Sequence, residues 1–300
     1  MAWGHQALAE LARCGHQVTD LSRGSWAASY AEAMKERRHL DALVVVGGDG
    51  MVHLGLQVCA EHQLPLGIVA AGSGNDLAAT LALPIHDIPA AVARINAGLA
   101  GEVATIDLGK VTGATVERPA APRYFGAVLS AGLDAAVAAY ARGLTRPRGP
   151  AKYKVATARE LMRFRPYGVR VRVDGRQWEQ TCTLVAIANA PVFGGGLRIS
   201  PNSSVTDGTL EVILAQALSK REIVRIFPKL YDGSHVSDPR VSIVPATHVT
   251  LEHVAMPGGA SAREGAALPA AFADGELVGG QPLSVEVVPG ALRVLGGTAG

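Results

Sequence analysis

The feature that most constrains the fold is the ten-residue stretch VVVGGDGMVH, which runs from Val44 to His53. Its three β-branched residues favour a strand that is covered on both faces. The glycines that follow permit positive φ and let a ligand approach the main chain closely, and residues 52–60 have apolar side chains at helical spacing. A strand, a glycine turn and a helix start form the usual setting for a bound phosphate, because free N–H groups and the helix dipole face the turn.

Asp49 stands inside this turn, although a carboxylate repels phosphate. A bridging cation, or a substrate hydroxyl that loses its proton, would explain an acid at this place. The structural alternative is that Asp49 caps the helix that begins there. On this stretch alone both explanations remain open.

Size and composition are those of an ordinary globular enzyme of two domains. The 300 residues are 48% hydrophobic and include 35 glycines,. A formal net charge of +2 gives no reason to expect a nucleic-acid partner,. The cysteines, Cys14, Cys59 and Cys182, form neither a disulfide framework nor a zinc spacing, which fits a reducing compartment. Because no leader and no bilayer-spanning apolar run is visible, we expect a cytoplasmic protein, soluble or peripheral to the membrane.

The order of the predicted elements divides the chain near residue 100. Before that point strands alternate with helices, which predicts a parallel sheet with helices on its faces. The strands are expected over 16–22, 44–46 and 66–70, and the helices over 7–13, 25–39, 52–60 and 88–98. After that point strands dominate, with a hairpin turning at Asp174-Gly175. We expect an α/β domain over 1–100 and a β-rich antiparallel domain over 101–300, whose last strand is a candidate to return to the first domain.

A second glycine loop repeats the logic of the first. In AAGSGNDLA a buried strand ends, Gly72-Ser73-Gly74 bends the chain, and Asn75-Asp76 begin a helix. The loop supplies main-chain N–H groups, and Ser73 adds a hydroxyl. Because the carboxyl ends of neighbouring parallel strands meet at one edge of a sheet, both loops could share one ligand. Either loop alone is a weak signal, and the two together are a much stronger one.

With these loops the sequence resembles the diacylglycerol kinase catalytic domain family, which includes bacterial lipid kinases and sphingosine kinases. Matching segments follow the family's order over nearly the whole chain. They are GGDG (47–50), GSGNDLA (72–78), IDLGKV (106–111), SAGLDAAVA (130–138), FGGGLRISPNSSVTDGTLEV (193–212) and DGE (274–276). The resemblance implies ATP-dependent phosphorylation of a lipid hydroxyl, as in diacylglycerol or a sphingoid base, with the nucleotide in the cleft between an N-terminal nucleotide-binding domain and a lipid-substrate domain.

The resemblance also implies roles for individual residues. Glu276 is the implied general base, with Asp274 beside it, and Asp49 is a third candidate for the chemistry. A structural magnesium site maps to Asp207, with Ser204 and Thr209 adding oxygen ligands. The implied nucleotide contacts are Ser22, Gly47, Gly48, Asp49, Gly50, Met51, Val52, His53, Leu54, Gly72, Ser73, Gly74, Asn75 and Asp76.

Elementary chemistry agrees with these roles and also leaves structural alternatives. Phosphoryl transfer needs positioned phosphates, charge neutralisation by Mg²⁺ and an oriented hydroxyl. Asp49 and Asp76 could hold Mg²⁺ directly or through water, and Glu276 can accept the alcohol's proton. Alternatively, Asp207-Gly208 is a plain turn and residues 274–276 are a hairpin tip. Structural roles are favoured for Asp107 and Asp134, and a solvated helix face for Lys152 and Lys154.

The sequence departs from the family pattern at two places. Family members open with a strand and an Asn-Pro-x-Ser-Gly loop, whereas MAWGHQALAEL at the start resembles the helix after that loop. Met51 stands where the family has Thr or Ser, and His53 and Leu54 replace a polar-acidic pair. These departures keep a second function open, that of a catalytically impaired lipid- or nucleotide-binding protein.

A soluble substrate, as in the related NAD kinases, fits less well because their downstream Asn-Glu motif is absent. The expected partners are ATP and a lipid at the membrane surface, with no nucleic acid, and a homodimer is compatible with the sequence.

Overall fold

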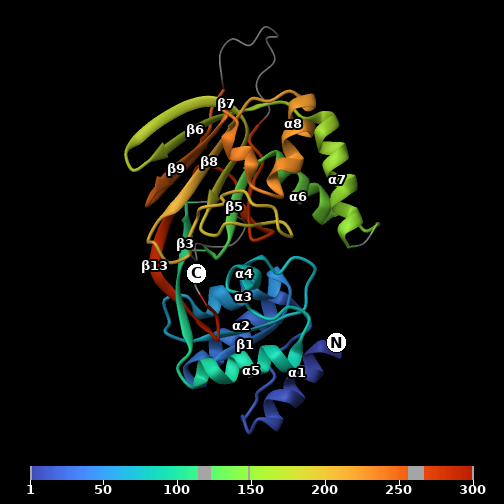
Figure 1. The fold of residues 1–300 in the computed structure, drawn as a ribbon, viewed down its shortest axis with the longest axis vertical. Coiled ribbons are helices and arrows are strands. Elements are labelled where there is room, and N and C mark those ends of the chain that lie inside the picture. Colours follow the sequence, from blue (N-terminus) through green and yellow to red (C-terminus); the bar gives the residue numbers. More distant parts are fainter. Residues whose placement is uncertain (1, 114–122, 148, 256–266, 299–300) are drawn as a thin grey trace.

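Two long strands, β3 (Val103–Thr112) and β13 (Leu283–Leu295), run antiparallel along one side of the molecule and join its two parts (Figure 1). The computed structural model describes residues 2–113, 123–147, 149–255 and 267–298. The first part comprises the elements before residue 100, which are mostly helices. The second part follows it and contains most of the strands.

The N-terminal part alternates helices and strands. Its elements are α1 (Ala2–Arg13), α2 (Trp26–Glu36), η1 (Arg37–His39), β1 (Leu43–Gly47), α3 (Asp49–Cys59), β2 (Leu66–Ala70), α4 (Asp76–Thr80) and α5 (Ile88–Leu99). β1 and β2 pair in parallel. Val45 joins the apolar cluster that includes α3, whereas Val44 and Val46 pack against the cluster of α1 and α5. The three valines are therefore covered on both faces, as their sequence predicts.

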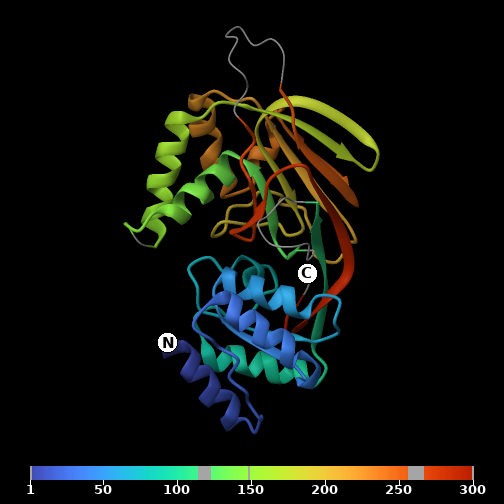
Figure 2. The same ribbon diagram turned by 180° about the vertical axis from the view of Figure 1, so that it is seen from behind.

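The C-terminal part is a large antiparallel arrangement with helices on one side. Its elements are β4 (Arg123–Phe125), β5 (Val128–Gly132), α6 (Leu133–Gly143), α7 (Pro150–Arg163), β6 (Tyr167–Val173), β7 (Arg176–Ala188), β8 (Leu210–Gln216), α8 (Lys220–Ile226), η2 (Phe227–Leu230), η3 (Ser234–Ser237), β9 (Val241–Ala246), β10 (His248–His253), β11 (Ala271–Ala273) and β12 (Glu276–Gly279). Figures 1 and 2 show α6, α7 and α8 together on the side opposite the β6–β7 hairpin.

One mixed sheet connects the two parts. Its main path runs β1-β2-β13-β10-β6-β7-β5-β11-β12. β13 pairs antiparallel with β3 and β10, and its residue Val294 lies parallel to Leu66 of β2. The predicted fold class, an α/β part followed by a β-rich part, is confirmed. Among the described residues, no helix is both long enough and apolar enough to cross a bilayer.

Most local predictions are confirmed, but the strand predicted over residues 16–22 is absent. The strand 66–70 and the hairpin at Asp174-Gly175 are present, and the helix expected from residue 52 already begins at Asp49. Residues 16–22 form no strand. The Ser22 N–H donates to the Asp20 side chain at 2.8 Å, and Val18 is 37% exposed. The segment has too few apolar side chains to bury, so it stays irregular and its polar groups bond locally,.

Candidate functional site

The two glycine loops meet at the carboxylate of Asp49. Asp49 Oδ2 accepts the N–H of Asn75 at 3.0 Å, and Oδ1 accepts the N–H of Asp76 at 2.9 Å. The loops touch so closely that a Cβ on Gly72 would lie 2.2 Å from Gly48 Cα, so neither position has room for a side chain. Although it opens α3, Asp49 uses its carboxylate to bind the N–H groups that begin α4, and it thereby fixes one turn against the other.

Asp76 extends this junction to the C-terminal part. Its carboxylate accepts the N–H groups of Gly195 and Gly196, with Oδ1 at 3.0 and 3.2 Å. Burial, followed by the charge of nearby Asp49, raises the pKa of Asp76 to about 6, although both N–H groups oppose the shift,. The structure thus brings two carboxylates close together at the edge of the glycine loops. Oxygen donors of this kind suit Mg²⁺.

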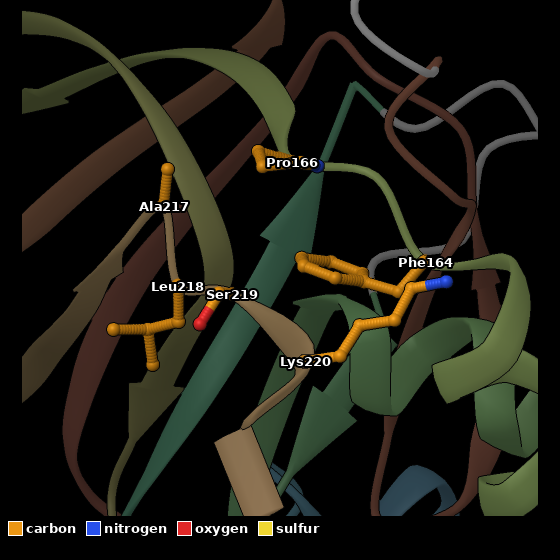
Figure 3. Close-up of a pocket in the computed structure, with 6 residues that line it drawn as sticks. All are labelled: Phe164, Pro166, Ala217, Leu218, Ser219 and Lys220. Atoms are coloured by element: carbon orange, nitrogen blue, oxygen red, sulfur yellow. The ribbon is translucent and has the colours of Figure 1, made fainter. Parts of the chain in front are cut away.

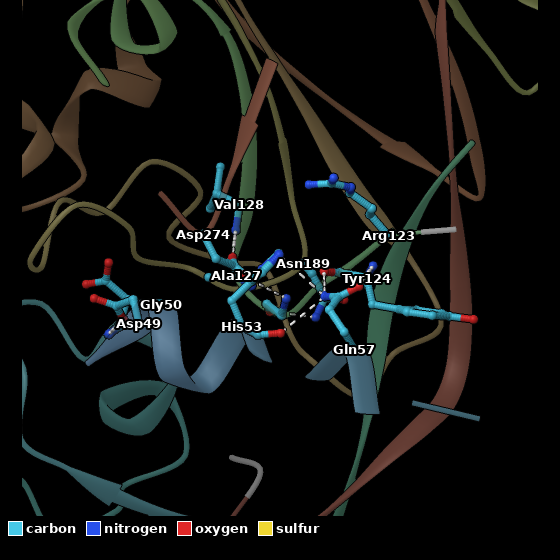
Figure 4. Close-up of polar contacts among 12 residues, drawn as sticks. Asp49, Gly50, His53, Gln57, Arg123, Tyr124, Ala127, Val128, Asn189 and Asp274 are labelled. Atoms are coloured by element: carbon cyan, nitrogen blue, oxygen red, sulfur yellow. Dashed lines mark hydrogen bonds and ion pairs between the residues drawn. The ribbon is translucent and has the colours of Figure 1, made fainter. Parts of the chain in front are cut away.

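The acidic motif Asp274-Gly275-Glu276 lies at the tip of the β11–β12 hairpin. Asp274 has φ +50° in this turn. Its carboxylate accepts three successive main-chain N–H groups, which belong to Gly126 (2.8 Å), Ala127 (3.0 Å) and Val128 (3.3 Å) (Figure 4). The hairpin is therefore fastened to the start of β5 through Asp274.

Glu276 carries the hairpin's second carboxylate to the glycine turn. A Cβ added to Gly50 would lie 3.2 Å from Glu276 Oε1. The other oxygen, Oε2, accepts a hydrogen bond from Arg142 of α6 at 2.9 Å, and the Glu276 side chain is 35% exposed. Residues that are more than 220 positions apart in the sequence thus meet at the N-terminus of α3. Arg142 has no sequence signal of its own, and its position was not anticipated.

One polar face of α3 binds the C-terminal part and was also missed. His53 Nδ1 lies 3.7 Å from Asp274 Oδ2. The Gln57 amide donates to Tyr124 O at 2.7 Å and accepts from Tyr124 N at 3.0 Å (Figure 4). Just beyond the helix, Glu61 accepts a hydrogen bond from the Tyr124 hydroxyl. The four-residue spacing of His53 and Gln57 was a usable signal, because such positions share one helix face,.

The other implied nucleotide contacts are divided between the surface and the interior. Ser22 and Ser73 are exposed. The Met51 side chain lies over the turn, where its Cγ is 2.7 Å from a Cβ placed on Gly47. The side chains of residues 52–54 are buried, so their contacts with a nucleotide would be limited to the main chain. The structure therefore brings residues 47–51 and 72–76 together and points the following side chains into the core.

The predicted magnesium ligands lie on a loop before β8. Asp207 Oδ1 accepts hydrogen bonds from the N–H and hydroxyl of Thr209, at 2.9 and 2.8 Å. The Ser204 hydroxyl lies 3.1 Å from that of Thr206. No three acidic, histidine or cysteine side chains converge as a metal cage within the described residues. One exposed carboxylate and the turn's oxygens fit only a magnesium ion that keeps several waters.

The two acids with expected structural roles lie elsewhere in the C-terminal part. Asp107 accepts the N–H groups of Gly208 at 2.7 Å and Gly290 at 2.8 Å, so it joins the loop before β8 to β13. Asp134 is at the start of α6, where burial raises the pKa of its carboxyl to about 6.

Comparisons with known proteins agree with this architecture. Residues 3–111 match the diacylglycerol kinase catalytic domain, and residues 127–296 match the YegS C-terminal NAD kinase beta sandwich-like domain. The chain is 35% identical to a diacylglycerol kinase of Mycobacterium tuberculosis over 293 residues, 97% of this chain and 88% of the relative. It is 24% identical to a diacylglycerol kinase of Bacillus subtilis over 250 residues, 82% of this chain and 78% of that relative.

A solved structure of a putative diacylglycerol kinase from Bacillus anthracis superposes with a TM-score of 0.71 at 20% identity, covering 97% of this chain and 91% of that one. That likeness concerns the fold. The matched domains and the relatives show that the chain belongs to the diacylglycerol kinase family of lipid kinases.

Proposed function

We propose that this protein is an ATP-dependent kinase that transfers the γ-phosphate of ATP to the hydroxyl of a membrane-derived lipid, such as diacylglycerol or a sphingoid base. One observation carries the proposal. Glu276, from the β-rich part, lies beside Gly50 of the glycine turn, with Oε1 3.2 Å from where a Cβ would be. A proton acceptor beside a phosphate-binding turn is the arrangement that phosphoryl transfer to an alcohol requires.

The glycine turn and the start of α3 would bind the phosphates of ATP. The turn has main-chain N–H groups and the positive end of an eleven-residue helix,. The absence of side chains at Gly48 and Gly72 lets the two turns pack directly against each other. Asp49 and Asp76 would hold a magnesium ion through bound waters beside the nucleotide phosphates, because their oxygens already accept main-chain N–H groups and Mg²⁺ usually keeps several waters,. Once bound, the ion would neutralise the charge of the transferred phosphoryl group.

Glu276 would orient the lipid hydroxyl and accept its proton. Arg142 engages Oε2, which leaves Oε1 on the side of the glycine turn. The demand on its basicity is small, because the hydroxyl proton leaves late in a loose transition state. Asp274 would act as a positioning residue, because its three N–H contacts hold the hairpin in place.

Transfer of a labelled phosphate tests this function directly. The purified protein is given γ-labelled ATP, Mg²⁺ and one acceptor at a time: diacylglycerol, sphingosine, glycerol or NAD. We expect label in a lipid product and none in glycerol phosphate or NADP. Label only in a soluble acceptor, or only in free phosphate, would contradict the proposal.

One structural observation favours the second function, that of a catalytically impaired lipid- or nucleotide-binding protein. The Met51 side chain lies over the phosphate-binding turn, where the family has a small hydroxyl residue. A catalytically impaired protein would bind an ATP analogue without transferring phosphate, and Met51→Thr would raise its turnover. Measurable phosphate transfer by the unmodified protein, at a rate equal to or above that of Met51→Thr, would rule this alternative out.

A further inference from the structure

His53 lies buried at the boundary between the two parts of the molecule. It belongs to α3 and is 2% exposed. Its Nδ1 atom has no hydrogen-bond partner among the residues that the structure describes. Asp274 Oδ2, on the β11–β12 hairpin, lies 3.7 Å from this atom (Figure 4), which is beyond the range of a hydrogen bond,. A buried polar atom without a partner costs stability, so its place in the site requires an explanation.

The neighbouring Gln57 indicates which ring nitrogen of His53 carries the proton. Tyr124 orients the Gln57 amide, because Oε1 accepts the Tyr124 N–H and Nε2 donates to the Tyr124 carbonyl oxygen. The Gln57 Nε2 then lies 3.5 Å from the His53 Nε2. An amide nitrogen only donates hydrogen bonds, so a proton on the histidine Nε2 would set two donors against each other. The neutral ring therefore carries its proton on Nδ1, on the side of Asp274.

Asp274 has room to accept this proton. Its Oδ1 accepts the N–H groups of Ala127 and Val128, whereas its Oδ2 accepts the N–H of Gly126 at 2.8 Å. Each carboxylate oxygen has two lone pairs, so Oδ2 can accept one more hydrogen bond. The Nδ1–H of His53 and this oxygen are thus a donor and an acceptor that match. A movement of about 0.8 Å would bring them to the usual distance of about 2.9 Å.

Like charges oppose the approach of the hairpin to the glycine loops. Burial and then the charge of Asp49 raise the pKa of Asp76, and the charge of Asp274 adds to that shift. The carboxylates of the two parts therefore repel one another. Binding of Mg²⁺ beside Asp49 and Asp76 would lower this repulsion, and the hairpin would then be free to move toward α3.

We propose that His53 is a positioning residue that closes the β11–β12 hairpin onto the glycine turn. When the magnesium nucleotide binds, the Nδ1–H of His53 donates to Asp274 Oδ2 and joins α3 to the hairpin. Glu276 lies two residues from Asp274 and faces Gly50 at the start of the same helix, so this contact sets its carboxylate in place,. The effect on turnover rests on the proposed function, whereas the hydrogen bond requires only that the nucleotide binds.

The alternative is a histidine that only fills space in the core, and the chain offers a matched example. His235 is 3% exposed, and its Nδ1 also lacks a hydrogen-bond partner within the described residues. Its Nε2 lies 3.1 Å from the carbonyl oxygen of Ile199. It belongs to η3, which packs against η2 and β9. Substitution of His235 therefore reports what the loss of a buried histidine does without any contact to the hairpin.

Nitrogen NMR of the full chain, labelled with ¹⁵N in histidine, tests the hydrogen bond without turnover. Spectra are recorded for the protein alone and with Mg²⁺ and a non-hydrolysable ATP analogue, and the His53 signals are identified by their loss in His53→Asn. We expect a proton on Nδ1 that exchanges with water about tenfold more slowly once the analogue binds. A proton on Nε2, or unchanged exchange with the analogue bound, would overturn this inference alone. Failure of the analogue to bind would contradict the kinase proposal as well.

Three substitutions of His53 separate the roles of the two ring nitrogens. The amide nitrogen of Asn takes nearly the place of Nδ1 and that of Gln nearly the place of Nε2, whereas Leu has no donor. We expect kcat to fall on the order of 100-fold in His53→Leu and His53→Gln, because a misplacement of about 1 Å costs that much. His53→Asn should keep most of the activity. The KM for ATP should change little in all three, because the nucleotide binds through the glycine loops.

Two controls measure the effect of lost stability alone. His235→Leu removes the matched buried histidine, and Leu218→Ala enlarges the hollow of about 360 Å³ where β8 leads into α8 (Figure 3). Both should lower the melting temperature and leave kcat unchanged. Normal kcat in His53→Leu, equal losses in the Asn and Gln variants, or an equal loss in the controls would overturn the positioning role. If His53→Leu does not fold, the comparison of Asn with Gln decides, and absence of turnover in the unmodified protein would contradict the kinase proposal while NMR still tests the contact.

Discussion

The glycine-loop junction and the Asp274–Glu276 hairpin use carboxylates in different ways. At the junction both oxygens of Asp49 accept main-chain N–H groups. On the hairpin Asp274 does the same, and its side chain is only 9% exposed, whereas Glu276 is 35% exposed and contacts the exposed side chain of Arg142. A carboxylate held by several main-chain donors is fixed and occupied, while one held by a single surface side chain remains available to a substrate.

This difference separates stability from turnover. Substitution of an occupied carboxylate leaves buried donors without partners and should lower both quantities. Substitution of the available carboxylate should lower turnover alone. Substitutions at four positions test this difference.

The largest effect on turnover is expected for Glu276→Gln. The amide keeps the size of the side chain but removes proton acceptance, so kcat should fall by about 10²–10⁴. The melting temperature should stay unchanged, because only one exposed ion pair is lost. Glu179→Gln, which removes an exposed ion pair with Arg170, serves as the matched control. A variant with normal kcat and weakened ATP binding would make Glu276 a nucleotide contact instead.

Asp49→Ala should reduce stability and turnover together. The substitution leaves the N–H groups of Asn75 and Asp76 without their acceptor, at a cost of about 1–3 kcal/mol each in the free energy of unfolding. Urea denaturation and initial rates would measure the two losses. Asp87→Ala is the comparison, because Asp87 caps α5 through one N–H at 3.0 Å and should cost only about 1 kcal/mol,. Unchanged stability of Asp49→Ala would remove the distinction between the two regions.

Asp76 should make stability depend on pH in the absence of metal. Its pKa is raised to about 6 in the folded state, against about 3.9 when unfolded,. Its contribution is therefore fully present below pH 4 and is lost as the pH rises through about 6, by roughly 3 kcal/mol. Unfolding by urea between pH 4 and 8 in EDTA would show this slope. Asp76→Asn should flatten it, and an identical slope in that variant would assign the effect to other groups.

The smallest effect is expected for Asp207→Asn. The amide oxygen can still accept the Thr209 N–H, so stability without metal should change by less than about 1 kcal/mol,. If the loop binds magnesium, the melting temperature of the unmodified protein should rise with added Mg²⁺ and that of the variant should rise less. Equal responses to Mg²⁺ would leave Asp207 with the role of a turn residue.

Local chemistry made most of the fold predictable. The valine run, the glycines and the helix after them follow one another within sixteen residues, and all three elements form where the pattern indicates. The strand expected over 16–22 fails because its polar groups bond locally and its sparse apolar side chains do not support a strand. The polar face of α3 could be recognised from the four-residue spacing of its polar side chains. Its partner could not, because Tyr124 is 67 residues from Gln57.

By itself the sequence determined the two glycine turns, the acidic hairpin and the membership in a kinase family, because these depend on short patterns of residue type. Only the tertiary structure decided which carboxylates are held by main-chain donors and which one is held by a single side chain. Asp49 reaches donors 26 and 27 residues away, and Asp274 reaches donors up to 148 residues away. Hydrogen bonds over such separations depend on how the chain packs, and they leave Glu276, with Arg142 as its contact, facing the glycine turn.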